Sequence, residues 1–130
     1  METLSFKTNT EELLDITAKI SDIVKKSNIE NGICYVYVPH TTCGLAINEN
    51  ADPSVKSDIL GELREMVNEN YPYRHAEGNS TAHIKSILTG NSLNIFIENN
   101  NLKLGTWQGI FLCEFDGHRN REVWIKLTAD

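Results

Sequence analysis

The chain has 130 residues, 40% of them hydrophobic, and a formal net charge of -6 at pH 7. At this length roughly two thirds of the unfolded surface can be buried, which favours one globular domain over residues 1–130. The acidic balance, with no run of Lys or Arg, argues against nucleic acid as a partner, and no apolar run approaches the roughly 18 residues that cross a bilayer.

The cysteines Cys34, Cys43 and Cys113 are odd in number and show no C-x-x-C spacing. The N-terminus has no charged region followed by an apolar one, as a secretory signal would. We therefore expect a reduced, cytoplasmic protein in which each cysteine is a small buried apolar residue.

The first part of the chain predicts a strand, a helix and a second strand. Residues 3–8 alternate polar and apolar side chains, as a half-buried strand does. Thr10, followed by two glutamates, predicts the start of a helix that carries Leu13 on its apolar face and runs to about Ser27. The β-branched and aromatic run at residues 34–38 predicts a buried strand.

The middle of the chain predicts another strand and two helices. Residues 45–47 resume a strand, and Asp52 followed by Pro53 is typical of a helix start. Residues 69–78 contain tyrosines, a proline and glycine and predict a loop. A third helix then follows, capped by Asn79 or Ser80, whose inward face is expected to carry Ile84, Ile87 and Leu88.

The last third predicts strands joined by Asn-rich and Asp-Gly turns. The turn at Asp116-Gly117 is expected to join the last two strands in a hairpin. The predicted strands are residues 92–97, 103–104, 108–115 and 121–127. The fold class is therefore α+β, a single domain with a mostly antiparallel or mixed sheet flanked by about three helices.

Residues 75–83 read His-Ala-Glu-Gly-Asn-Ser-Thr-Ala-His and are the first candidate site. Two imidazoles, a carboxylate and an amide in so short a stretch would each need a polar partner if buried. With His40, which follows a predicted strand, His75 and His83 form a set that could bind zinc. General acid-base or hydrogen-bonding roles, and purely structural ones, stay open for the same residues.

Two further groups of polar residues lie at predicted strand ends. Glu114 and Asp116 precede Arg119 and Arg121, which predicts either a surface ion-pair ladder or arginines that bind phosphate while the carboxylates orient them or hold a cation. The second group holds Asn48, Glu49 and Asp52, where Asp52 is explained as a helix cap. Trp107, between two nearby glycines, is interpreted as either a core residue or a pocket wall.

Taken together, an ordered set of motifs resembles the YjbQ-like family, which is also described as the secondary thiamine-phosphate synthases. The resemblance extends over nearly the whole chain, although the first 30 residues carry no matching signature. The motifs are His40-Thr41-Thr42, Asn48-Glu49-Asn50-Ala51-Asp52, His75-x-Glu77-Gly78-Asn79, Ala82-His83, Gly105-Thr106-Trp107-Gln108 and Glu114-x-Asp116-Gly117-x-Arg119-x-Arg121.

The resemblance implies a compact α+β domain assembled as a homotrimer, with sites near subunit contacts. It also implies a low thiamine-phosphate synthase activity, which joins a pyrimidine diphosphate to a thiazole phosphate and releases pyrophosphate. The physiological substrate is left open, because the activity is described as secondary.

Residues and resemblance together predict one site for a phosphorylated small molecule. Its expected metal ligands, for a divalent cation such as Zn²⁺ or Mg²⁺ or alternatively for an anion, are His40, His75 and His83. Its expected catalytic residues are His83, Glu49 and Glu77. Its expected substrate-binding residues are Asn48, Asn79, Trp107, Gln108, Arg119 and Arg121. Two rival functions stay open, a non-catalytic anion- or metabolite-binding trimer and a metal-dependent hydrolase.

Overall fold

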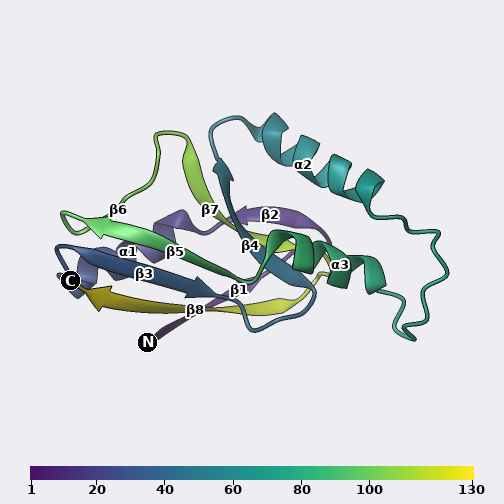
Figure 1. Ribbon diagram of the computed structural model, residues 1–130, viewed down its shortest axis with the longest axis horizontal. Coiled ribbons are helices and arrows are strands. Elements are labelled where there is room, and N and C mark those ends of the chain that lie inside the picture. The colour runs from purple at the N-terminus through teal and green to yellow at the C-terminus, as the bar shows by residue number, and fades with distance from the viewer.

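Two antiparallel β-sheets form the centre of the computed structural model, which describes residues 1–130 (Figure 1). The larger sheet has the strand order β1-β8-β3-β5-β6 and the smaller one the order β2-β7-β4. The strands are β1 (Glu2–Lys7), β2 (Glu12–Asp15), β3 (Gly32–Tyr37), β4 (Cys43–Glu49), β5 (Ser92–Glu98), β6 (Asn101–Leu102), β7 (Gln108–Glu114) and β8 (Asn120–Ala129). The helices are α1 (Thr17–Ser27), α2 (Pro53–Met66) and α3 (Ser80–Thr89). The predicted α+β fold class is confirmed.

The smaller sheet is covered on both faces, which explains the continuous apolar run in β7. Ile110 and Leu112 on one face of β7 pack in a cluster with α1 and with the inner side chains of the larger sheet. Phe111 and Cys113 on the other face pack in a second cluster with Ala82 of α3 and with half-buried residues of α2. Period-two alternation thus divides the side chains of one strand between two cores.

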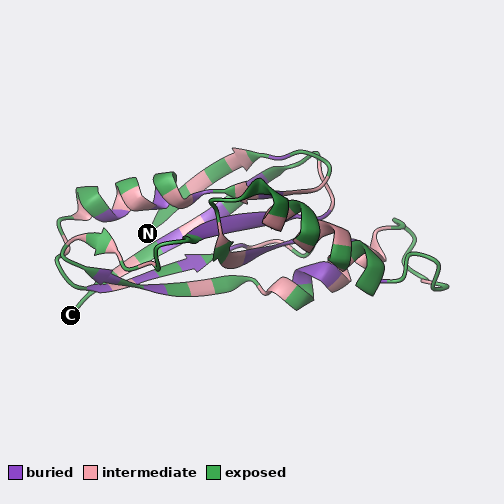
Figure 2. Cartoon of the chain, turned by 90° about the horizontal axis from the view of Figure 1, so that it is seen from above, coloured by how far each residue is buried: buried purple, intermediate pink, exposed green.

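The outer face of the larger sheet is uncovered. Tyr35 and Tyr37 of β3 and Phe96 of β5 alternate with buried residues and are exposed. Tyr37 stacks on Trp124 of β8, with ring centroids 5.7 Å apart. Figure 2 shows the buried residues concentrated on the central strands, whereas α2 has none. None of the three helices combines the length and apolar character needed to cross a membrane.

The three cysteines are free and buried. Burial raises the pKa of the Cys34 and Cys43 thiols to about 11 and that of Cys113 to about 12. Thiols of such high pKa stay protonated and unreactive at neutral pH, which agrees with their interpretation as small apolar residues.

The predicted start of the first helix is wrong. Leu13 lies on β2, which pairs with β7, and α1 begins only at Thr17. Asp15 Oδ1 accepts hydrogen bonds from the Thr17 amide (3.0 Å) and hydroxyl (2.6 Å), so the local start signal is Asp15 rather than Thr10. The pairing of β2 with β7 outweighs the helical spacing of Leu13 and Ile16. Over so few residues, the helical and strand periodicities cannot be told apart.

The predicted inward face of the third helix is also wrong in part. Ile87 and Leu88 of α3 are 82% and 54% exposed, and the buried residues are Ala82, Lys85 and Ser86. Ser86 donates a hydrogen bond to the Cys43 carbonyl at 2.6 Å. Polar side chains of α3 therefore face the protein interior, because hydrogen-bond partners are available to them there.

The predicted hairpin of the last two strands does not form. β7 belongs to the smaller sheet and β8 to the larger one, so residues 115–119 cross from one sheet to the other. The short strand predicted at residues 103–104 is instead β6, at Asn101–Leu102, which pairs with β5. The helix start at Asp52 is confirmed, since its side chain accepts a hydrogen bond from the Ser54 amide.

Candidate functional site

A polar pocket of about 370 Å³ opens at one end of the two sheets. Apart from Pro39, every residue that lines it is polar or charged, which is unusual for a cavity formed by packing alone. These residues are His40, Thr41, Thr42, His75, Glu77, Asn79, His83, Arg119 and Arg121. A larger cavity of about 650 Å³ lies between α1 and the strands β1 and β8, but it holds none of the predicted site residues.

Three connections that are distant in sequence build the pocket. The β3–β4 connection supplies His40 and the two threonines that follow it. The α2–α3 connection supplies His75 and Glu77, and the start of α3 supplies Asn79 and His83. The β7–β8 crossover supplies Arg119, and β8 itself supplies Arg121. The three predicted histidines and both predicted arginines are therefore brought together.

The histidines differ in their surroundings. The rings of His75 and His83 meet edge to face, with centroids 5.3 Å apart and an interplanar angle of 87°. The Nε2 atom of His40 accepts a hydrogen bond of 2.9 Å from the backbone amide of Glu122. Burial, with the nearby Arg121 guanidinium, lowers the pKa of His40 below its ordinary value.

The donor set does not fit the predicted three-histidine metal centre. No three His, Cys, Asp or Glu side chains are arranged to hold a metal ion. His75 and His83 alone would leave a zinc ion short of the three protein ligands that catalytic zinc sites use.

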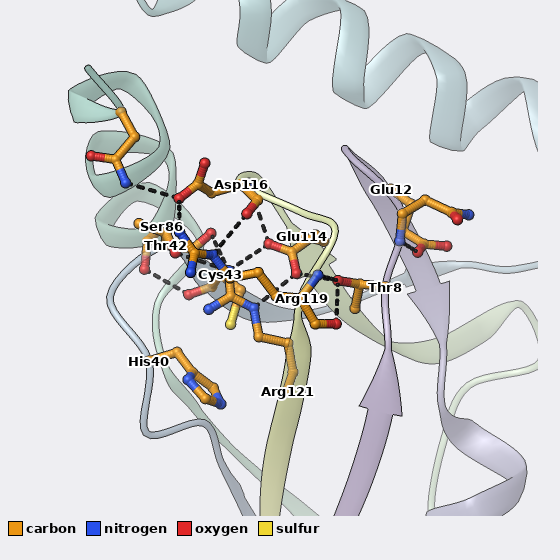
Figure 3. Close-up of polar contacts among 12 residues, drawn as sticks. Thr8, Glu12, His40, Thr42, Cys43, Ser86, Glu114, Asp116, Arg119 and Arg121 are labelled. Carbon is orange, nitrogen blue, oxygen red and sulfur yellow. Dashed lines mark hydrogen bonds and ion pairs between the residues drawn. The ribbon is translucent and has the colours of Figure 1, made fainter. Parts of the chain in front are cut away.

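A buried ion pair holds Arg121 against the wall of the pocket (Figure 3). The Arg121 side chain is 4% exposed and that of Glu114 is 0% exposed. Arg121 Nε donates to Glu114 Oε1 at 2.8 Å, and Nη2 donates both to Glu114 Oε2 and to Thr42 Oγ1. Thr8 donates its hydroxyl hydrogen to Glu114 Oε1. Nη1 is the guanidinium nitrogen that has no partner within the chain.

The Glu114 carboxyl is held in its charged form. Burial by itself would raise its pKa, but hydrogen bonds from Arg121, Thr8 and the Asp116 amide outweigh that effect, and the pKa lies below its ordinary value. The buried pair is therefore an internal support of the pocket rather than the surface ladder that was one sequence interpretation.

A second carboxylate orients the second arginine. Arg119 donates from Nε to the Asp116 carbonyl at 2.9 Å and from Nη2 to Asp116 Oδ2 at 2.8 Å. Asn79 Nδ2 donates to the same Oδ2 atom at 2.8 Å, which ties the start of α3 to the crossover. Asn79 Oδ1 is buried without a partner. The Arg119 side chain is 47% exposed and keeps donors free toward the pocket.

Four predicted site residues do not line this pocket: Asn48, Glu49, Trp107 and Gln108. In the β4–β7 ladder, Cys43 pairs with Glu114, whereas Glu49 pairs with Gln108 six residues further along. At the rise of a strand this separation is about 20 Å. The residues at the far end are Asn48, Glu49, Trp107 and Gln108. Their roles in binding or catalysis stay predictions, but they do not share one cavity with the histidines of the same chain.

Local contacts account for part of this distant group. Glu49 Oε2 accepts a hydrogen bond from the Asp52 amide at 3.2 Å, next to the capped start of α2. Trp107 is 63% exposed, so it is not the core residue that one sequence interpretation suggested, and it does not line the polar pocket. Its backbone carbonyl accepts a hydrogen bond from the Asn50 amide at 3.0 Å, which closes the far end of the ladder.

Thr8 and Thr42 are the supporting residues that sequence reasoning missed. Both bind the Glu114–Arg121 pair, from the end of β1 and from the β3–β4 connection. Thr42 follows His40 within the His-Thr-Thr motif, so that motif was the available signal. Thr8 offers no such signal, because its contact with Glu114 spans 106 positions.

The fold and the pocket define an α+β domain of two antiparallel sheets with a site rich in histidine and arginine at one end. The family model described as "UPF0047 protein YjbQ-like" matches residues 2–130. The chain therefore belongs to the YjbQ-like UPF0047 family, in agreement with its resemblance.

Similar sequences and structures cover almost the full chain. A UPF0047 protein of Methanocaldococcus jannaschii is 53% identical and the alignment covers 95% of this chain and 91% of that protein. The UPF0047 protein YugU of Bacillus subtilis is 45% identical, with 99% of each covered. The crystal structure of an uncharacterized conserved protein of the same family from Clostridium acetobutylicum has a TM-score of 0.95 at 48% identity, covering 98% of this chain and 100% of the other.

Proposed function

We propose that the pocket binds a phosphorylated small molecule and that the protein is a low-activity transferase of the thiamine-phosphate synthase type. The observation that carries the proposal is the convergence of two guanidinium groups and three imidazoles in one polar pocket. Such a donor set matches the charge and geometry of phosphate groups. The particular reaction comes from the family resemblance.

In the proposed reaction, a ring nitrogen of a thiazole phosphate attacks the methylene carbon of a pyrimidine diphosphate. The new carbon–nitrogen bond forms as the carbon–oxygen bond to the diphosphate breaks, and pyrophosphate leaves with the electron pair. Negative charge therefore grows on the leaving group. Arg119 and Arg121 would stabilise that charge, because they are already oriented by Asp116 and Glu114 before any substrate binds.

His83 and Glu77 are the proposed acid-base residues of the pocket. His83 would donate a proton to the departing pyrophosphate, and its edge-to-face contact with His75 restricts the orientation of its ring. Glu77 lines the same pocket and is exposed, so its carboxylate could orient a substrate hydroxyl or a water molecule. Arg119 and His83 are therefore the residues to test.

The test is pyrophosphate release from the pyrimidine diphosphate and thiazole phosphate by the full chain. We expect Arg119→Ala to lower turnover by about a hundredfold, the effect of losing one donor to a developing charge. His83→Ala should also lower turnover. Lys103→Ala is the matched control, because Lys103 is an exposed cation that pairs with Glu98 away from the pocket. Unchanged turnover in both pocket variants would overturn the proposal.

A non-catalytic anion-binding protein is the second candidate. The same polar pocket favours it, since binding needs the oriented arginines but no acid or base. The two functions separate in one comparison: pyrophosphate that binds in calorimetry without any turnover of the proposed substrates favours the binding protein. The metal-dependent hydrolase has less support, because no three-ligand set is present.

We also propose the homotrimer that the family resemblance implies. Exposed aromatic side chains, among them Tyr35, Tyr37 and Phe96, provide apolar surface that an assembly would cover.

A further inference from the structure

We propose that His40 is a neutral hydrogen-bond donor to a bound oxyanion and not a metal ligand, so that the pocket selects oxyanions over divalent cations. This inference rests on the proposed function in one respect, namely that the pocket binds a phosphorylated compound. It takes up the anion alternative of the sequence hypothesis and departs from the other alternative, which placed His40 among three metal ligands.

The first step is the tautomer of His40. A neutral imidazole has one nitrogen that donates a hydrogen bond and one that accepts. A backbone amide can only donate, and the Glu122 amide lies 2.9 Å from His40 Nε2. Nε2 must therefore be the accepting nitrogen, which places the proton on Nδ1.

The second step is the position of the Nδ1–H group. His40 makes no hydrogen bond through Nδ1 within the chain. The residue lines the polar pocket together with Arg121, and the two side chains lie beside each other in Figure 3. Nδ1 is not among the buried atoms left without a partner, so it is accessible. His40 thus offers an uncharged donor in the pocket that Arg121 also lines.

The third step is the cost of binding a cation there. Coordination of a metal through Nδ1 would require the lone pair of that nitrogen while Nε2 still accepts from Glu122. Such a ring would have no proton on either nitrogen and would be an imidazolate anion. Otherwise the Glu122 amide of β8 would lose its hydrogen bond to His40. The neighbouring Arg121 guanidinium adds repulsion against any cation placed at this wall.

The electrostatics of the wall agree with a neutral ring. Burial and then Arg121 lower the pKa of His40, and together they outweigh the opposite effect of the Glu122 and Glu114 carboxylates and of the hydrogen bond from the Glu122 amide. The ring therefore stays uncharged at neutral pH, and an oxyanion meets one neutral N–H and the charged donors of the arginines rather than a third cation. A charged imidazole beside Arg121 would be repelled by the guanidinium.

The first measurement is the tautomer itself, read from long-range nitrogen–proton NMR spectra of the full chain. We expect a protonated Nδ1 and an unprotonated Nε2 at His40 at neutral pH. A protonated Nε2 would overturn the proposal, whatever the variants show.

The second measurement is calorimetric binding of inorganic pyrophosphate and, separately, of Zn²⁺ to a matched pair of variants. In His40→Asn the side-chain amide can keep a donor near the Nδ1 position. In His40→Gln the Oε1 atom can accept from the Glu122 amide, but no donor remains at the Nδ1 position. We expect the pyrophosphate Kd to rise about tenfold or more in His40→Gln, as for a lost hydrogen bond to a charged group, and to change far less in His40→Asn. Zn²⁺ affinity should be the same in both variants and the wild type.

The outcomes separate this inference from the proposed function. Pyrophosphate binding that depends on His40 as expected, without any transferase turnover, would support the inference and count against the function. Turnover that needs Arg119 while His40→Gln binds pyrophosphate as the wild type does would overturn the inference alone. The inference would also be overturned if both His40→Gln and His40→Asn abolished Zn²⁺ binding. It would likewise be overturned if the wild type did not bind pyrophosphate. Thermal melting of each variant shows whether it is folded.

Discussion

At the scale of single residues, the buried ion pair of Glu114 and Arg121 is the contact whose loss would cost the most stability. Both side chains are withdrawn from water and each needs the other, because an unpaired charge in the interior is costly. Thr8 and Thr42 complete the hydrogen bonds of the pair. The arginine is therefore rigid before a ligand arrives, which reduces the entropy lost on binding.

Removing the charge of Glu114 should reveal this dependence. We expect Glu114→Gln to lower the free energy of unfolding by about 3 to 5 kcal/mol, since Arg121 would stay buried without a counter-ion. Glu98→Gln makes the same chemical change in an exposed pair with Lys103 and should cost about 1 kcal/mol or less. Urea unfolding measures both, and equal losses would contradict the buried pair.

The same carboxylate predicts a dependence of stability on pH. The pKa of Glu114 is lower in the folded protein than its ordinary value of 4.5, so the unfolded chain binds the proton more readily. The stability from Glu114 is complete above that ordinary value and is lost as pH falls through the lower folded pKa. The difference in unfolding free energy between the wild type and Glu114→Gln should therefore shrink below about pH 4.5. Urea unfolding at a series of pH values tests this, and a difference that grows toward acid would contradict it.

At the scale of elements, the docking of α3 on β4 decides the position of the pocket. α3 carries His83 and begins at Asn79, and its polar residue Ser86 binds the Cys43 carbonyl at the start of β4. Gly44 allows the close approach, because a Cβ there would lie 2.0 Å from Thr89 Oγ1 and 2.7 Å from the Gly90 carbonyl oxygen. The end of the helix therefore rests directly on the strand.

A methyl group at Gly44 should loosen this docking. We expect Gly44→Ala to destabilise the protein by about 1 to 3 kcal/mol, as overpacking does, because one of the two obstructing atoms is backbone. Gly61 of α2 is the matched control, since a Cβ there meets nothing within 4 Å and Gly61→Ala should stabilise the helix by about 0.5 to 1 kcal/mol. Thermal unfolding compares the two variants. Changes of the same sign would contradict the close contact.

At the scale of the whole molecule, two sheets with different environments explain where polar and apolar side chains lie. The smaller sheet is covered on both sides, whereas the larger one leaves Tyr35, Tyr37 and Phe96 on an open face. Single exposed aromatics are ordinary, but several on one sheet face provide surface for association.

The assembly is tested by light scattering after size exclusion. We expect a mass of three times the 14.7 kDa chain, because the family resemblance implies a homotrimer and the open aromatic face supplies apolar area. The measurement is made at two concentrations well apart, so that a weak assembly is recognised by its dissociation. A mass of one chain at both concentrations would contradict the expectation.

Local signals in the sequence determined much of the fold and part of the site. The strand alternation and the Asp52-Pro53 helix start involve residues that are neighbours in the chain, so they are visible without a structure. The histidines and arginines were also recognisable, because their motifs combine several polar groups within a few residues. Five of these residues do meet in one pocket: His40, His75, His83, Arg119 and Arg121.

Only the tertiary structure decided which of the recognised residues share that pocket and in what chemical state. The register of β4 on β7 separates Glu49 and Gln108 from the histidines, and strand pairing shifts the start of α1. The amide of Glu122 sets the tautomer of His40 from a position 82 residues away. Such contacts depend on long-range pairing of the chain, which periodicity and caps do not encode, because those report only on residues within a few positions of one another.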